Sequence, residues 1–151
     1  MAIYLIRHGS AGKRSGSSDD FLRPLDAKGQ EQAKALAKHL GDDGISRVLA
    51  SPALRCQQTV GALARKCDLE VEVADWLAEG NSDRTVIKRI AKLGNENVAM
   101  CSHGDVIPEV IRALEARGMT INGDRGWKKG AVWTIHVRDG IAKSADYLPV
   151  P

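Results

Sequence analysis

The sequence predicts an α/β protein in which helices cover both faces of a mostly parallel central sheet. Two apolar runs, 3–6 and 98–101, are too short for helices and are typical of strands buried on both faces. Segments whose apolar residues recur every three to four positions lie between such runs and indicate amphipathic helices. The expected order β, α, β, α, β, α, β, α, β, β favours a single three-layer sandwich domain over residues 1–151.

The first two helices have recognisable starts. One is predicted over 26–40, and the next over about 52–66, with Ser51 as its N-cap and Pro52 in its first position. Their predicted buried residues are Ala33, Leu36, Ala37 and Leu40 in the first, and Cys56, Val60, Leu63, Ala64 and Cys67 in the second.

Two more helices follow in the second half. Ser82 is the expected cap of the third, and Asp105 of the fourth, with Gly118 beyond its end. Their predicted apolar stripes are Val86, Ile87, Ile90 and Leu93 in the third, and Ile107, Val110, Ile111 and Leu114 in the fourth.

The remaining strands are short. Residues 48–50 and 70–73 are predicted strands, and 76–80 a loop. Alternation over 131–137, followed by the hairpin signal Asp139-Gly140 and a last strand, closes the chain. The segment 119–130 is expected to be irregular.

Composition narrows the class of protein. With 43% hydrophobic and 27% charged residues, the chain is an ordinary globular protein. The net charge of +3 is too small to indicate a nucleic-acid or membrane partner, and it mildly favours an anionic substrate. No apolar run has transmembrane length, and no signal peptide is expected. Cys56, Cys67 and Cys101 lack CxxC spacing and are expected to be reduced, in a cytoplasmic protein.

Histidines follow two of the predicted core strands. Arg7-His8-Gly9 ends the first strand, and Ser102-His103-Gly104 ends the strand 98–101. Ligands of open α/β sheets bind beyond the carboxyl ends of the strands, so the imidazoles converge if these strands are neighbours. Arg55, about one turn into the second helix, is expected at the same edge. Arginine offers a planar fork of donors suited to phosphate oxygens.

These motifs resemble the histidine phosphatase superfamily, also called phosphoglycerate mutase-like. The resemblance rests on Arg7-His8-Gly9, Ser51-Pro52-x-x-Arg55-x-x-x-Thr59 and Ser102-His103-Gly104. The segment 23–33 is similar to the small SixA-like branch of phosphohistidine phosphatases. Residues 101–108 and 129–133 are also similar to the phosphatase domain fused to some MutT-type Nudix hydrolases.

The resemblance implies a role for each matching residue. His8 is the expected nucleophile, forming a phosphohistidine that water hydrolyses. Arg7 and Arg55 neutralise the phosphate oxygens, and His103 donates hydrogen bonds or positive charge. Further phosphate contacts are expected from Gly104, Ser10 and Ser102, although both hydroxyls can equally be turn-capping groups. No metal or cofactor is expected.

Two loops are candidates for the rim of the site. Many members of the family carry a glutamate after the third strand that protonates the leaving group, and Glu79 lies in the equivalent stretch. The SixA-like branch often lacks this acid, and Glu79 can also be an exposed loop carboxylate. The polar loop 11–20, with Lys13 and Arg14, either folds over the site or is a solvated linker. Asp26 and Asp105 are interpreted as helix caps rather than catalytic groups.

The predicted function is that of a metal-independent phosphatase acting on phosphohistidine in proteins or on small phosphomonoesters. A non-catalytic phosphate-recognition module and a phosphomutase are the alternatives. A cysteine-based phosphatase is disfavoured, because Ile107 stands where the Cys101 loop would need arginine. The expected partner is a phosphate-bearing substrate, without nucleic acid or membrane, and the protein is a monomer or a dimer.

Overall fold

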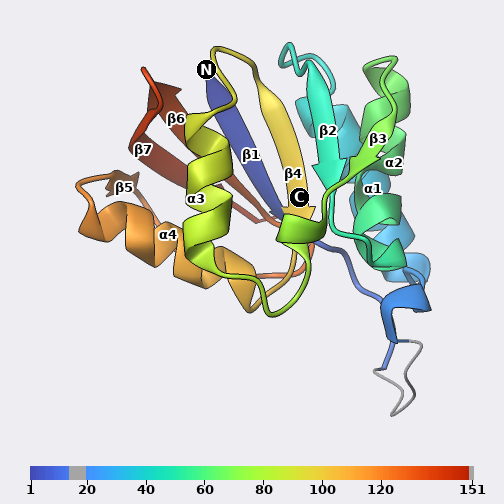
Figure 1. Cartoon of the computed structure of the whole chain (residues 1–151). Coiled ribbons are helices and arrows are strands. Elements are labelled where there is room, and N and C mark those ends of the chain that lie inside the picture. Colours follow the sequence, from blue (N-terminus) through green and yellow to red (C-terminus); the bar gives the residue numbers. More distant parts are fainter. Residues whose placement is uncertain (14–19, 150–151) are drawn as a thin grey trace.

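The computed structural model has one central sheet with helices on both faces (Figure 1). It describes residues 1–13 and 20–149. The sheet has seven strands in the order β3-β2-β4-β1-β6-β7-β5. Pairing is parallel from β3 to β1, and β6 is antiparallel to both β1 and β7. The predicted mostly parallel α/β sandwich is therefore confirmed.

The chain order is β1, α1, β2, α2, β3, α3, β4, α4, β5, β6, β7, with two short 3₁₀ turns. The strands are β1 (Ala2–Arg7), β2 (Arg47–Ala50), β3 (Val71–Val73), β4 (Val98–Ser102), β5 (Thr120–Asn122), β6 (Val132–Arg138) and β7 (Ile141–Leu148). The helices are α1 (Ala27–Leu40), α2 (Leu54–Lys66), α3 (Asp83–Ala91) and α4 (Val106–Ala116), and the turns are η1 (Asp20–Leu22) and η2 (Asp75–Leu77).

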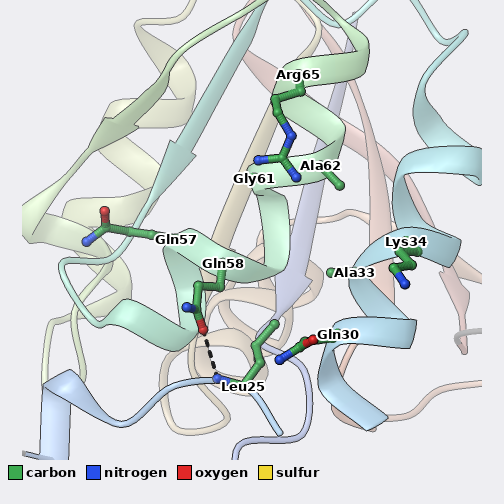
Figure 2. A pocket seen from close by; sticks show the side chains of 9 residues that line it. All are labelled: Leu25, Gln30, Ala33, Lys34, Gln57, Gln58, Gly61, Ala62 and Arg65. Atoms are coloured by element: carbon green, nitrogen blue, oxygen red, sulfur yellow. Dashed lines mark hydrogen bonds between the residues drawn. The ribbon is translucent and has the colours of Figure 1, made fainter. Parts of the chain in front are cut away.

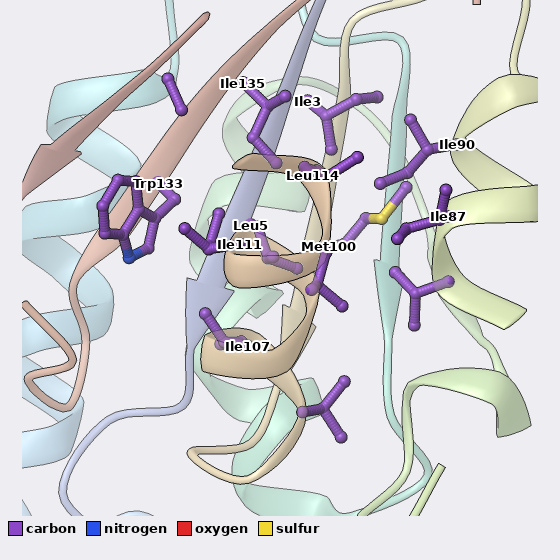
Figure 3. Close-up of a cluster of buried hydrophobic side chains, with 14 of the residues drawn as sticks. Ile3, Leu5, Ile87, Ile90, Met100, Ile107, Ile111, Leu114, Trp133 and Ile135 are labelled. Carbon is purple, nitrogen blue, oxygen red and sulfur yellow. The ribbon is translucent and has the colours of Figure 1, made fainter. Parts of the chain in front are cut away.

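Strand β1 contributes to the core on both faces of the sheet, because successive side chains of a strand point to opposite faces. Ile3 and Leu5 pack with α3 and α4 in the cluster shown in Figure 3. Tyr4 and Ile6 pack with α1 and α2 on the other face. Leu5 is fully buried, and truncating it to alanine would cost about 2–5 kcal/mol of stability.

Local signals explain most helix boundaries. The Asp26 carboxylate accepts a hydrogen bond from the Gly29 N–H at 2.8 Å and caps α1. Ser82 caps α3 by accepting from the Arg84 N–H at 3.1 Å. Gly118 follows α4 with a φ of 110°, a left-handed conformation that favours glycine. In the described part of the chain, no helix is both long enough and apolar enough to cross a membrane.

The predicted start of α2 is wrong. The helix begins at Leu54 rather than Pro52, because Ala53 has an extended backbone with a ψ of 132°. Ser51 is not its N-cap. The Ser51 Oγ instead lies 2.8 Å from Nε2 of His103, and it accepts a hydrogen bond from the Ala53 N–H.

Two other expectations need correction. Asp105 precedes α4, but its side chain makes no capping hydrogen bond, and its own backbone is already helical. The segment 119–130 is not wholly irregular, because it contains β5, which pairs in parallel with β7. Only Ile121 of this strand is even half-buried, so it has too little hydrophobic patterning to be predicted.

Candidate active site

The site lies where β1 and β4 end side by side. Arg7 is paired with Ser102 in the parallel register, so the next residue of each strand leaves the sheet at the same edge. The rings of His8 and His103 are 5.4 Å apart between centroids and inclined by 65°. The expected convergence of the two imidazoles is thus observed.

His8 is held as a neutral imidazole. Its side chain is buried, and its Nδ1 lies 2.8 Å from the carbonyl oxygen of Gly9. A proton on Nδ1 donated to that carbonyl leaves the lone pair of Nε2 available. Burial is the main reason that the pKa of His8 falls from 6.5 to about 3. The neighbouring positive groups add to this lowering, and the Gly9 carbonyl opposes it.

Two arginines, Arg7 and Arg55, lie beside the histidines. Arg55 is 1% exposed, and its Nη1 donates to the backbone oxygen of Asp20 at 3.0 Å. Nη1 of Arg7 donates to the Trp127 carbonyl oxygen, and burial lowers the pKa of Arg7. Nε of each arginine is buried and has no hydrogen-bond partner among the described residues. Buried donors are normally satisfied, so these two N–H groups suit an anionic ligand with several acceptor oxygens.

His103 is fixed from both sides of its ring. Its Nε2 lies 2.8 Å from the Ser51 Oγ, and its Nδ1 lies 3.3 Å from a carboxylate oxygen of Glu79. A proton on Nδ1 then faces the carboxylate. Cys56 Sγ is 3.6 Å from the same Nε2, so the ring is packed against α2.

Glu79 lies at the rim of the site. It follows η2, and its carboxylate pairs with both Arg55 and His103. Gly80 follows it with a φ of 78°, which allows the bend that folds the loop back. The loop therefore brings the Glu79 carboxylate beside Arg55 and His103.

The other predicted phosphate contacts have structural partners. The Ser102 hydroxyl is buried and donates to the Leu77 carbonyl oxygen at 2.6 Å. The Ser10 hydroxyl donates to the Asp26 carboxylate, also at 2.6 Å. Both hydroxyl hydrogens are used within the fold, which favours the structural alternative for the two serines.

Gly104 also has a structural role, beside the phosphate contact expected of it. A Cβ at this position would lie 2.8 Å from Cζ of Arg7, so the absence of a side chain lets the guanidinium lie against the backbone. Gly104 thereby sets the position of a phosphate-binding side chain.

Two residues without a predicted role of their own contribute to the site. Asp20, the last residue of the polar loop 11–20, places its Oδ2 3.4 Å from Nη2 of Arg55. Thr59, which shares a helix face with Arg55, accepts from the Gly9 N–H and donates to the Arg55 carbonyl. It thus joins α2 to the turn after β1. Lys13 is exposed, and Arg14 lies outside the described residues.

A separate hollow of about 380 Å³ lies between α1 and α2 (Figure 2). Its wall includes Leu25, whose N–H donates to Oε1 of Gln58 at 2.9 Å. Neither histidine of the strand-end site lines this hollow, so it does not belong to that site. Within 1–13 and 20–149, no cluster of three or more His, Cys, Asp or Glu residues is arranged to hold a metal ion.

The model of the histidine phosphatase superfamily (branch 1) matches residues 3–85, which include both arginines, His8 and Glu79. The chain belongs to the histidine phosphatase superfamily. It is 33% identical over 155 aligned positions to an 8-oxo-(d)GTP phosphatase of Mycolicibacterium smegmatis, an alignment that covers 99% of this chain and 48% of the relative. The chain thus spans about half the length of that relative.

Solved histidine phosphatase structures share the fold. The protein histidine phosphatase SixA, solved with tungstate, superposes with a TM-score of 0.79 at 23% identity, covering 99% of this chain and 95% of SixA. A phosphoserine phosphatase from Entamoeba histolytica, solved with phosphoserine, gives 0.66 at 18% identity, covering 93% of each chain. The superfamily match confirms the family resemblance of the sequence, and these neighbours show that the fold is shared.

Proposed function

We propose that the chain is a metal-independent phosphatase that acts through a covalent phosphohistidine on His8. The observation that carries the proposal is the state of His8, a buried neutral imidazole with Nδ1 on the Gly9 carbonyl and a pKa of about 3. Such a ring is a usable nucleophile at neutral pH. The two arginines beside it supply positive charge for the phosphate.

In the first step, Nε2 of His8 attacks the phosphorus atom of the substrate. A nitrogen–phosphorus bond forms as the bond from phosphorus to the leaving group breaks. Arg7, Arg55 and His103 stabilise the charge on the other phosphate oxygens. Glu79, when protonated, gives its proton to the leaving oxygen.

In the second step, water attacks the phosphorus of the phosphohistidine. The carboxylate of Glu79 takes a proton from this water, and the nitrogen–phosphorus bond breaks. Inorganic phosphate leaves, and His8 is again neutral. The proton that Glu79 takes from this water replaces the one that it gave to the leaving group in the first step.

The position of Glu79 favours small phosphomonoesters over phosphohistidine as substrates. An alkoxide leaving group needs a proton, whereas the nitrogen of a phosphoramidate is protonated readily. Glu79 contacts Arg55 and His103, two of the groups that hold the phosphate in this proposal. The relatives act, by their names, on an oxidised nucleotide, on phosphohistidine and on phosphoserine.

Release of phosphate from para-nitrophenyl phosphate tests the proposal, with and without a metal chelator. Activity is expected to persist in chelator. His8→Ala is expected to abolish turnover with an unchanged thermal unfolding profile. Acid quenching of the wild-type reaction should trap a phosphoryl group on His8, and a label at another residue would overturn the assignment. If the protein binds phosphate tightly but does not turn over, the result would favour a non-catalytic phosphate-recognition module. If the phosphoryl group returns to the product instead of passing to water, the result would favour a phosphomutase.

A further inference from the structure

The turn after β1 is bound by the side chain of Gln32, a half-buried residue of α1. Its Oε1 accepts a hydrogen bond from the Ser10 N–H at 2.8 Å. Its Nε2 donates to the carbonyl oxygen of Lys129 at 3.3 Å. The side-chain amide therefore connects the peptide group 9–10, in the turn, to the peptide group 129–130, in the segment before β6.

Both of these peptide groups also bind His8. The carbonyl of the group 9–10 belongs to Gly9, and its oxygen lies 2.8 Å from Nδ1 of His8. The N–H of the group 129–130 belongs to Gly130 and donates to the backbone carbonyl of His8 at 3.1 Å. The two groups thus hold the ring and the backbone of this histidine.

The orientation of the Gln32 amide is determined by its partners. An N–H donor faces Oε1 and a carbonyl acceptor faces Nε2, so exchanging the two ends would place like groups against each other. Helix α1 can approach the turn because Gly29, one turn before Gln32, has no side chain. A Cβ on Gly29 would collide with the carbonyl oxygen of Ser10. The contact is therefore part of the packing of α1 against the turn.

The Gly9 carbonyl determines which ring nitrogen of His8 carries the proton, since a hydrogen bond at one nitrogen of an imidazole selects the tautomer. It can do so only while its peptide plane faces the ring. Gln32 holds the other end of that plane, and a hydrogen bond to the Ser10 N–H also strengthens the carbonyl as an acceptor. Thr59 cannot replace this contact, because it binds the preceding peptide group through the Gly9 N–H.

We propose that Gln32 is a positioning residue that keeps His8 in the tautomer with the proton on Nδ1 and the lone pair on Nε2. This role rests on the proposed function, in which Nε2 of His8 is the nucleophile, and deepens it by naming what holds the ring. Gln32 acts through the peptide group 9–10 and not on the substrate. Its loss should therefore slow the attack on phosphorus without weakening phosphate binding, because both arginines stay in place.

The test compares Gln32→Met, Gln32→Glu and Gln30→Met. Methionine has a similar length and a similar helix propensity but no amide, whereas glutamate keeps an acceptor oxygen for the Ser10 N–H. Gln30→Met makes the same exchange at an exposed position of the same helix and is the matched control. NMR of the imidazole nitrogens in histidine-labelled protein reports the tautomer of His8, and thermal unfolding reports whether each variant folds.

Wild-type protein should show one His8 tautomer, protonated on Nδ1, and Gln32→Met should show a mixture of both. For para-nitrophenyl phosphate, kcat of Gln32→Met should fall about tenfold or more, with KM changed less than about twofold. Gln32→Glu should keep the wild-type tautomer and most of kcat, and Gln30→Met should keep the tautomer, kcat and KM. Gln32→Asn, whose amide is one methylene too short to reach both peptide groups, should also shift the tautomer, and it replaces Gln32→Met if that variant does not fold.

An unchanged His8 tautomer in a folded Gln32→Met or Gln32→Asn variant would overturn the inference, whatever the loss of kcat. A fall in kcat that is equally large in Gln32→Glu would also overturn it. The NMR measurement needs no turnover and so separates this inference from the proposed chemistry. A phosphoryl group trapped on another residue would refute His8 as the nucleophile, whereas the tautomer shift in the Gln32 variants would still be expected.

Discussion

The carboxylate of Asp105 accepts a hydrogen bond from the backbone N–H of Gly80 at 2.9 Å. This bond joins the residue before α4 to the loop that carries Glu79. The structure thus gives Asp105 a tertiary partner in place of the capping role that its sequence position suggests. Because Gly80 directly follows Glu79, the bond positions the carboxylate that faces Arg55 and His103.

Asp105→Ala should slow hydrolysis of alkyl phosphates by about tenfold, because the loop loses the acceptor that holds it over the site. Asp105→Asn keeps an acceptor oxygen and should recover most of the lost rate. Para-nitrophenyl phosphate, whose leaving group needs little protonation, serves as the reference substrate. If both substrates slow equally, Asp105 supports the fold and does not position the acid.

Glu79→Gln should slow alkyl phosphates by about 10²-fold or more, the usual range for loss of a general acid. It should hardly change the hydrolysis of an activated aryl ester or of phosphohistidine. The measurement is kcat across a series of leaving groups of graded basicity. A uniform loss over the series would show that Glu79 acts by pairing with Arg55 rather than by proton transfer.

The fold could be predicted wherever local chemistry and packing agree. The α1 stripe of Ala33, Leu36, Ala37 and Leu40 is buried as expected, and Asp26 caps that helix. The Asp139-Gly140 turn has left-handed φ values of 53° and 76°, as a tight hairpin requires. Strand β5 escaped prediction because its pairing with β7 is a tertiary contact without an apolar pattern.

The site could be predicted where residues follow the strand ends. His8 and His103 directly follow the ends of β1 and β4, so they lie together because these two parallel strands are neighbours in the sheet. The partners of hydroxyl and carboxylate side chains were harder to predict from the sequence, because short polar side chains have many local partners. Ser51 resembles a helix cap but faces His103, and Asp20 reaches Arg55 from a loop without periodicity.

Gly104→Ala should disturb phosphate binding without unfolding the protein. The new Cβ would come within 2.8 Å of the Arg7 guanidinium, the movable end of a flexible side chain, so Arg7 shifts and the backbone stays. KM for para-nitrophenyl phosphate should rise about tenfold. Gly61→Ala in α2 is the control, since its Cβ meets only Nη1 of Arg65 at 3.5 Å. That control should keep its KM and gain up to about 1 kcal/mol of stability. An unchanged KM in Gly104→Ala would contradict the positioning role.

The low pKa of His8 predicts that the nucleophile survives acidification. An exposed histidine is half protonated near pH 6.5, whereas His8 should stay neutral down to about pH 3. An NMR titration of the imidazole should therefore show no protonation between pH 7 and about 5. Over the same range, the single-turnover rate should not fall with an apparent pKa of 6.5. A His8 titration midpoint near 6.5 would contradict the neutral buried state.

The same shift predicts how stability depends on pH. Between pH 6.5 and about 3, His8 is protonated in the unfolded chain but not in the native protein. The unfolded state then binds more protons, so the free energy of unfolding falls as the pH is lowered through this window, by up to about 1.4 kcal/mol per pH unit from this group. Above pH 6.5 the contribution is constant.

Urea unfolding of wild-type protein and His8→Gln at pH 7, about 5.5 and about 4.5 measures the effect. The variant lacks the titrating ring, so its free energy of unfolding should fall less steeply with acid than that of the wild type. His39→Gln is the matched control, because it removes an exposed histidine of α1 and leaves the site intact. Its pH dependence should follow the wild type. Parallel curves for wild type and His8→Gln would mean that His8 is protonated equally readily in the folded and unfolded protein. That result would contradict a neutral His8 nucleophile.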